Sequence, residues 1–333
     1  MGQEISSQIN LFKQIREKIP ANLSFVHEVS ELLGISYDSA YRRIRGEKEL
    51  SMEELQKLCQ HYSISVDTFF NLSKECIIFH SVPIGDGGKT FGEWLQSISA
   101  DLRMIHESHE REIYYFAKDI PLFHYLEFPS VFAFKSFFWH KALFPGSIAG
   151  DLFDPSVSPE DLIILGRHML AYYNKIQVIE IWNMESFDSI LRQIEFCFVS
   201  GYFKSKEDAL DLLSEVEAMI RHLQHQAEHG FRFFRGEEPL GASGMYKLYL
   251  NEVMLGDNTI LVKINGHRKV YLTYNVINLL TTQDENFCQQ IEDSLQNLMQ
   301  QSTLISSTAA KERNRFFNHL AAEIWQLMES ISK

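Results

Sequence analysis

The chain has 333 residues, of which 45% are apolar and 23% are charged. This length predicts two or three domains, and the composition excludes collagen-like, low-complexity and small disulfide-stapled proteins. The four cysteines lie far apart, without a CxxC pair or a signal peptide, which favours the cytoplasm over a secreted disulfide framework or a zinc ribbon. No apolar run is long enough to span a bilayer, so we expect no membrane partner.

The formal net charge of −13 argues against non-specific coating of nucleic acid by the whole chain. One short segment differs from the rest. Between Ser36 and Lys48 there are four basic residues and only two acidic ones, Asp38 and Glu47. This segment leaves room for one small basic surface.

The first 75 residues have the pattern of a four- or five-helix domain. Apolar spacing predicts helices over residues 8–18, 24–33, 36–45 and 51–62, with a last short turn over 66–72. Pro20 ends the first helix, Gly34 suits the left-handed turn after the second, and Ser51 to Glu54 form a capping box for the fourth. The β-prone and glycine-rich residues 76–92 are expected to form a linker.

Residues 93–333 are expected to form a larger helical α+β domain, which makes the fold class mainly α. The pattern is helical from Phe91 to about Phe234, after which three strand-like runs predict a small antiparallel β-meander at about 245–275. Asn265-Gly266 predicts a hairpin between the last two runs, since both residues tolerate positive φ. Two amphipathic helices over about 284–301 and 309–331 complete the prediction.

The segment from Gly34 to Gly46 predicts a helix-turn-helix. Ala40 and Ile44 would face inward, and Ala40 is small where two helices approach closely. The opposite and flanking faces would then carry Tyr37, Asp38, Tyr41, Arg42 and Arg45. A helix of this kind fits the major groove, where arginine can bond guanine and aspartate can accept from cytosine.

Over residues 10–72 the sequence resembles the Cro/C1-type (XRE) helix-turn-helix family. The spacing from Val29-Ser30 through Gly34-Ile35-Ser36 to Arg45-Gly46 matches without a gap, and residues 50–65 are similar to that family's fourth helix and closing turn. The resemblance implies base contacts at Tyr37, Asp38 and Arg42. It also implies that Ser36, Arg43, Arg45 and Lys48 lie near phosphate-contacting positions.

These observations predict a DNA-binding transcriptional regulator that acts in the cytoplasm and is not an enzyme. The expected partners are double-stranded DNA and a second copy of the chain, with a small-molecule or protein effector left open; no cofactor is expected. The predicted DNA-contacting residues are Ser36, Tyr37, Asp38, Ser39, Tyr41, Arg42, Arg43, Arg45 and Lys48. The larger domain is expected to dimerise and to sense an effector.

Two other classes of protein stay open at this stage. His222, His225 and His229 at i, i+3 and i+7 have a spacing that can surround a metal, as in a metal-dependent enzyme fused to a helix-turn-helix. No HExxH or GxSxG motif accompanies them, so we assign no metal ligand and no catalytic residue. The other alternative is a protein-interaction scaffold whose helix-turn-helix does not bind DNA.

Two apolar segments each allow a structural and a functional interpretation. The stretch Tyr114–Phe153 holds thirteen aromatic residues and is either core or the lining of a small-molecule pocket. The C-terminal stripe is either core or a dimer seam. Its residues are Phe316, Phe317, Leu320, Ile324, Leu327 and Met328.

Overall fold

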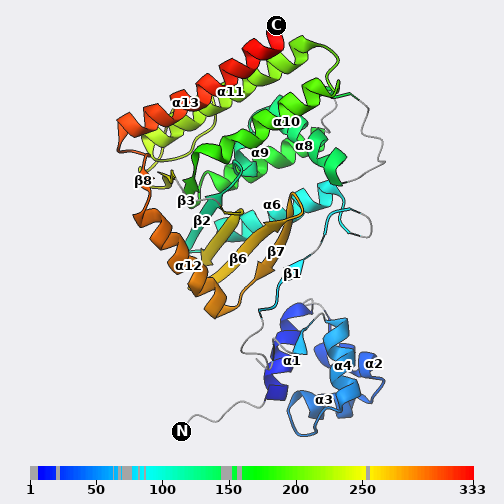
Figure 1. Cartoon of the computed structure of the whole chain (residues 1–333). Helices are drawn as coiled ribbons and strands as arrows, with labels where there is room; N and C mark the ends of the chain where they lie inside the picture. Colours follow the sequence, from blue (N-terminus) through cyan, green and yellow to red (C-terminus); the bar gives the residue numbers. More distant parts are fainter. Residues whose placement is uncertain are drawn as a thin grey trace. The chain divides into compact units, whose positions relative to one another are not determined.

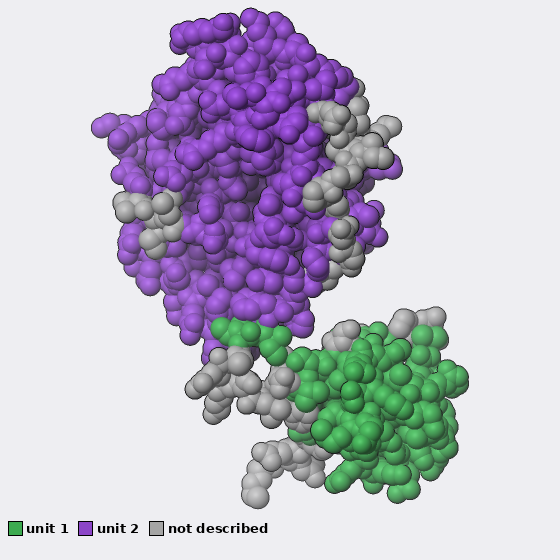
Figure 2. All heavy atoms as spheres, turned by 45° about the vertical axis from the view of Figure 1, so that its right-hand side comes forward, with its two compact units in different colours: residues 1–78 green, residues 79–333 purple. Residues whose placement is uncertain are grey.

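The computed structural model divides the chain into two compact units, Met1–Ile78 and Phe79–Lys333 (Figure 2). The structure describes residues 7–19, 23–62, 64–66, 69, 77–81, 83–85, 88–143, 152–155, 160–252 and 256–333. Among these residues no helix combines the length and apolar character that crossing a membrane requires. Each unit is described by itself.

In the first unit the described residues form helices α1 (Ser7–Lys18), α2 (Phe25–Leu33), α3 (Tyr37–Ile44) and α4 (Met52–His61) (Figure 1). They pack around one small apolar core that consists of Leu11, Phe12, Ile15, Val29, Leu33, Ala40, Leu58 and Cys59. The four predicted helices are confirmed. The predicted last turn over residues 66–72 lies largely outside the described residues.

Local chemistry sets the junctions between α2, α3 and α4. Gly34 adopts the left-handed conformation, with φ 66° and ψ 38°, so that α2 ends sharply and α3 begins three residues later. The Ser36 hydroxyl accepts a hydrogen bond from the Ser39 amide and caps α3. Ser51 and Glu54 form the predicted capping box at the start of α4.

In the second unit the described residues contain one eight-stranded mixed sheet with the order β1-β7-β6-β5-β2-β3-β4-β8. Neighbours β2, β3 and β4 run parallel, and every other pair is antiparallel. The strands are β1 (His80–Ser81), β2 (Arg111–Ala117), β3 (Gln177–Trp182), β4 (Tyr246–Leu250), β5 (Thr259–Ile264), β6 (His267–Tyr274), β7 (Asn278–Thr282) and β8 (Thr303–Leu304).

Helices cover both faces of this sheet (Figure 1). Alternate residues of β2 show the division: Ile113 and Tyr115 join the large core cluster, whereas Tyr114 and Phe116 join a smaller one that includes Cys288. The smaller cluster lies beneath α12 (Glu285–Gln300). The larger lies beneath α6 (Phe91–Glu107), α7 (Leu122–Tyr125), α8 (Pro129–Leu143), α9 (Glu160–Tyr173), α10 (Asp188–Val199), α11 (Lys206–His229) and α13 (Ala310–Ser332).

The expectation of a small antiparallel β-meander at 245–275 is wrong. Strand β4 pairs in parallel with β3, and β2 and β3 lie in a region where the sequence predicted helices throughout. Both strands are buried on two faces, so their apolar residues lack the alternation that marks a half-buried strand. The β5–β6 hairpin is confirmed, with positive φ at Asn265 and Gly266.

The structure also gives the positions of the expected linker and of the C-terminal helices. Part of the expected linker 76–92 belongs to the second unit, where β1 pairs with β7 and α6 begins at Phe91. The C-terminal helices are close to the predicted ranges. Phe316, Phe317, Leu320 and Ile324 of α13 are buried in the core of this chain, and Leu327 and Met328 pack against it half-buried, so most of the stripe is core.

A buried carboxylate ties helices to the centre of the sheet. Glu180 in β3 accepts hydrogen bonds from Tyr173 (2.7 Å) and Tyr246 (3.1 Å), and the Nε2 atom of His124 lies 3.0 Å from both carboxylate oxygens. Burial acts to raise the pKa of Glu180, but His124, the nearby Arg232 and the Tyr173 hydroxyl together lower it below its usual value. The carboxylate therefore stays charged and holds α7, α9 and β4 against β3.

Candidate nucleic-acid interface

Helix α3 has one buried face and one exposed face. Ala40 and Arg43, three residues apart, point into the first unit and are only 0% and 6% exposed. On the other side Tyr37 and Tyr41 are 57% and 44% exposed. The two tyrosines therefore give the exposed face of α3 two aromatic rings that a partner surface can contact.

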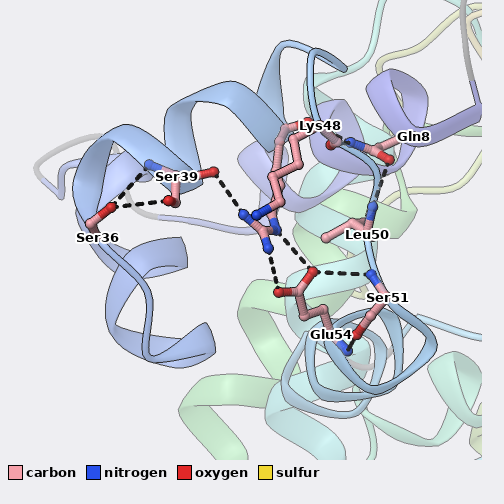
Figure 3. A network of polar contacts seen from close by, with 8 residues as sticks. Gln8, Ser36, Ser39, Lys48, Leu50, Ser51 and Glu54 are labelled. Carbon is pink, nitrogen blue, oxygen red and sulfur yellow. Dashed lines mark hydrogen bonds and ion pairs between the residues drawn. The ribbon is translucent and has the colours of Figure 1, made fainter.

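Arg43 attaches α3 to the next helix. Its Nε and Nη2 atoms donate to Oε2 and Oε1 of Glu54 at 2.9 and 2.7 Å, and Nη1 donates to the Ser39 carbonyl at 3.2 Å (Figure 3). Glu54 also accepts from the Ser51 amide at 3.0 Å, so one carboxylate serves the cap of α4 and the ion pair. The hydrogen bonds from Arg43 are the main reason that the pKa of Glu54 is lowered.

Gln8 of α1 holds the segment that follows α3. Its Nε2 donates to the carbonyls of Arg43 (2.7 Å) and Lys48 (2.8 Å), and its Oε1 accepts from the Leu50 amide (3.1 Å). Figure 3 shows Gln8 beside Lys48 and Leu50, on the far side of the network from Ser36. The end of α3 and the loop to α4 are thus bonded to a third helix.

The exposed face holds the polar side chains that could meet DNA. Arg42 is exposed, and the guanidinium of Arg45 lies 5.6 Å from the centroid of the Tyr41 ring, with its Nε 3.3 Å from Glu47. Ser36, Asp38 and Lys48 are also exposed, and Ser39 is half-buried against the Ser36 cap. All the predicted contact residues except Arg43 and Ser39 are therefore exposed.

Arg43, which the family resemblance places near phosphate-contacting positions, does not lie on the outer face of α3. Ile44, expected to be the inward residue, is only half-buried at the edge of the core. Arg43 is buried because Glu54, eleven residues later in the chain, neutralises its guanidinium. The capping-box motif predicts that Glu54 caps α4, but it does not predict that the same carboxylate pairs with Arg43. The exposed residues of α3 and the loop after it include three basic side chains, those of Arg42, Arg45 and Lys48. They also include two acidic side chains, those of Asp38 and Glu47.

The three histidines of α11 are arranged around an aromatic ring. The Nε2 atom of His222 lies 3.0 Å from the carbonyl of Phe233, and the rings of His225 and His229 lie 5.3 and 5.7 Å from the Phe233 ring. In the part of the chain that the structure describes, no three His, Cys, Asp or Glu side chains are grouped to hold a metal ion.

The helices of the first unit, the glycine turn at Gly34 and the open face of α3 define a helix-turn-helix module. Residues 10–78 match the model of the BetR domain family, a helix-turn-helix class of DNA-binding domain. The match supports the helix-turn-helix expectation and names this family, not the Cro/C1-type family that the motifs resemble. No curated protein and no solved structure matches the chain.

Substitution of two adjacent arginines should have very different effects on stability. Arg43→Ala removes a buried, bidentate partner and should destabilise the first unit by about 2–3 kcal/mol, whereas Arg42→Ala should change its stability by less than about 0.5 kcal/mol. Amide hydrogen exchange of α3 and α4 in the intact chain measures both effects. Equal protection in the two variants would contradict the assigned role of Arg43.

The cost of Arg43→Ala should also depend on pH. The pKa of Glu54 is lower in the folded chain than in the unfolded one, so its contribution is complete above its ordinary pKa of 4.5 and is lost as the pH falls through the lowered value. The difference in the free energy of unfolding between Arg43→Ala and the parent should therefore become smaller only at acidic pH.

Proposed function

We propose that this chain is a sequence-specific, DNA-binding transcriptional regulator and not an enzyme, with α3 as the helix that enters the major groove. The observation that carries the proposal is the match of residues 10–78 to a helix-turn-helix DNA-binding family. The exposed face of α3 supports it, because this is the face that such a module presents to base edges.

The side chains of this face have the chemistry that base recognition needs. Arg42 has an exposed guanidinium that can bond the O6 and N7 atoms of guanine in bidentate fashion, and Asp38 can accept from the N4 amino group of cytosine. Tyr37 and Tyr41 can pack on thymine methyl groups. We assign phosphate contacts to the rim of the face, at Ser36, Ser39, Arg45 and Lys48.

The Arg43–Glu54 pair and Gln8 contribute by holding α3 before DNA arrives. Both sets of bonds meet at Arg43, near the C-terminal end of α3, and a helix held in place there loses less conformational freedom on binding, which favours affinity and a defined register. Arg43 acts from inside the module, so we remove it from the DNA-contacting set.

We further propose that two copies act together and that residues 79–333 dimerise and sense an effector. Only three exposed basic groups flank the face of α3, and binding two half-sites at once compensates for weak contacts at each. Residues 76–333 carry 22 basic and 33 acidic residues, a net charge of −11 that opposes non-specific binding to DNA. With no membrane-spanning helix among the described residues, we place this regulator in the cytoplasm.

Neutralising Arg42 tests the assigned face. Genomic fragments selected with the parent protein supply the duplex, and fluorescence anisotropy measures its affinity. Arg42→Ala should lose about 1–3 kcal/mol of binding free energy, or roughly 5–150-fold in Kd. Arg103→Ala makes the same charge change on an exposed side chain of the second unit and should leave affinity unchanged. A parent protein that ignores all duplexes at low salt would refute the proposal.

The spacing of the selected sequences tests the paired binding separately. Two helix-turn-helix modules related by a two-fold axis should select inverted half-sites whose centres are about 10 base pairs, or 34 Å, apart, or a multiple of that distance. Single half-sites bound with a stoichiometry of one chain per duplex would show that one module acts alone.

A further inference from the structure

The second unit contains a cavity that the DNA-binding function does not use. Its volume is about 200 Å³, and it lies between α6, α8 and the face of the sheet formed by β2, β5, β6 and β7. Most of the wall is apolar, with Ile98, Ile105, Ile113, Ile260, Val262 and Leu279 among its aliphatic residues. An apolar cavity of about 150 Å³ holds benzene, so this one has room for a ring with a short substituent.

Hydrogen-bond donors without partners line one part of the wall. The Nε1 atom of Trp94 and the hydroxyl of Tyr125 are buried and have no hydrogen-bond partner among the described residues. Both side chains are more than nine-tenths buried, at 6% and 1% exposure. Leaving such groups unpaired costs free energy, which a ligand with acceptor oxygens would recover.

A buried ammonium group lies beside these donors. Lys135 of α8 is 2% exposed, and its Nζ donates to Oε1 of Gln193 at 2.8 Å. The same Nζ lies 5.2 Å and 5.0 Å from the ring centroids of Tyr125 and Trp139. The Trp94 and Tyr125 rings lie 6.4 and 6.5 Å from that of Trp139, so the side chains of Trp94, Tyr125 and Lys135 all surround the Trp139 ring.

The charge of Lys135 has no close counter-ion among the described residues. Burial lowers the pKa of Lys135 to about 8, against the opposing effect of Asp119, so the amine is still mainly protonated at pH 7. Asp119 lines the cavity but forms no ion pair with Lys135. Asp101, the other acidic residue of the wall, already accepts from Tyr271 at 2.9 Å and lies 3.6 Å from Lys269.

We propose that this cavity is a binding site for a small monocarboxylic acid with an apolar body about the size of one ring. The carboxylate accepts hydrogen bonds from Lys135, Tyr125 and Trp94 and supplies the missing counter-ion, and the body occupies the aliphatic part of the cavity. This proposal does not depend on DNA binding by the first unit. It assigns a ligand class to residues 79–333.

The cavity is tested by titrating the intact chain, without DNA, with phenylacetate and hexanoate. All four tryptophans lie in the second unit, and Trp94 and Trp139 line the cavity, so tryptophan fluorescence follows its occupancy. We expect saturable binding of the acids and binding at least tenfold weaker for phenylacetamide, which keeps the size but lacks the charge. Failure of both acids to bind overturns the proposal.

Substitutions locate the site and separate it from general acid binding. Lys135→Met keeps an unbranched side chain and should weaken phenylacetate binding at least tenfold, and Tyr125→Phe should weaken it several-fold with the ring retained. Lys141→Met is the matched control, because Lys141 lies on the same helix, 4.4 Å above the Tyr202 ring, and does not line the cavity. It should bind phenylacetate as the parent does.

Two results would contradict the assigned ligand class even if a small molecule binds. Tighter binding of 2-phenylethylamine than of phenylacetate would make Asp119 the anchor in place of Lys135. Unchanged phenylacetate affinity in both Lys135→Met and Tyr125→Phe would place the acid elsewhere. If Lys135→Met does not fold, Tyr125→Phe still decides the outcome.

Discussion

The ion pair between Arg43 and Glu54 determines which face of α3 the helix-turn-helix can present to DNA. A guanidinium enters the interior of a small domain only with a carboxylate positioned to meet it, and Glu54 meets it with two bonds at 2.9 and 2.7 Å. The pair fixes the C-terminal end of α3 to the start of α4, and Gln8 of α1 bonds the carbonyl of the same Arg43. Everything proposed for the outer face of α3 depends on this internal attachment.

The same rule on buried charge separates the structural sites of this chain from the site proposed for a ligand. Arg43 forms an ion pair with Glu54, and Glu180 is bonded by His124 and two tyrosine hydroxyls. Among the described residues, the ammonium group of Lys135 contacts an amide oxygen and the faces of two rings, and Asp119 acts on it without forming an ion pair. A buried charge without a close counter-ion among the described residues, beside an empty volume of ring size, is what distinguishes the proposed binding site from these structural sites.

Sequence patterns located the first unit well because its signals are local. Gly34, Ser36 and the box from Ser51 to Glu54 mark helix ends by their own chemistry, and the four helices follow. The sheet was largely missed, because strands buried on both faces lack alternation and their partners are distant in sequence. Arg43 was misplaced for the same reason: its environment depends on a residue in another helix. The donors around Lys135 likewise converge from separate helices, α6, α7 and α8.

The most direct test of the role of Arg43 is the DNA affinity of a chain carrying Arg43→Met and Glu54→Met together. Two apolar side chains can keep α3 packed on α4 without the charges, and replacing a buried ion pair in this way is often neutral for stability. If Arg43 acts only from inside, the double variant should bind the selected duplex within about threefold of the parent. A folded double variant that loses tenfold or more would mean that the Arg43 guanidinium itself contacts DNA.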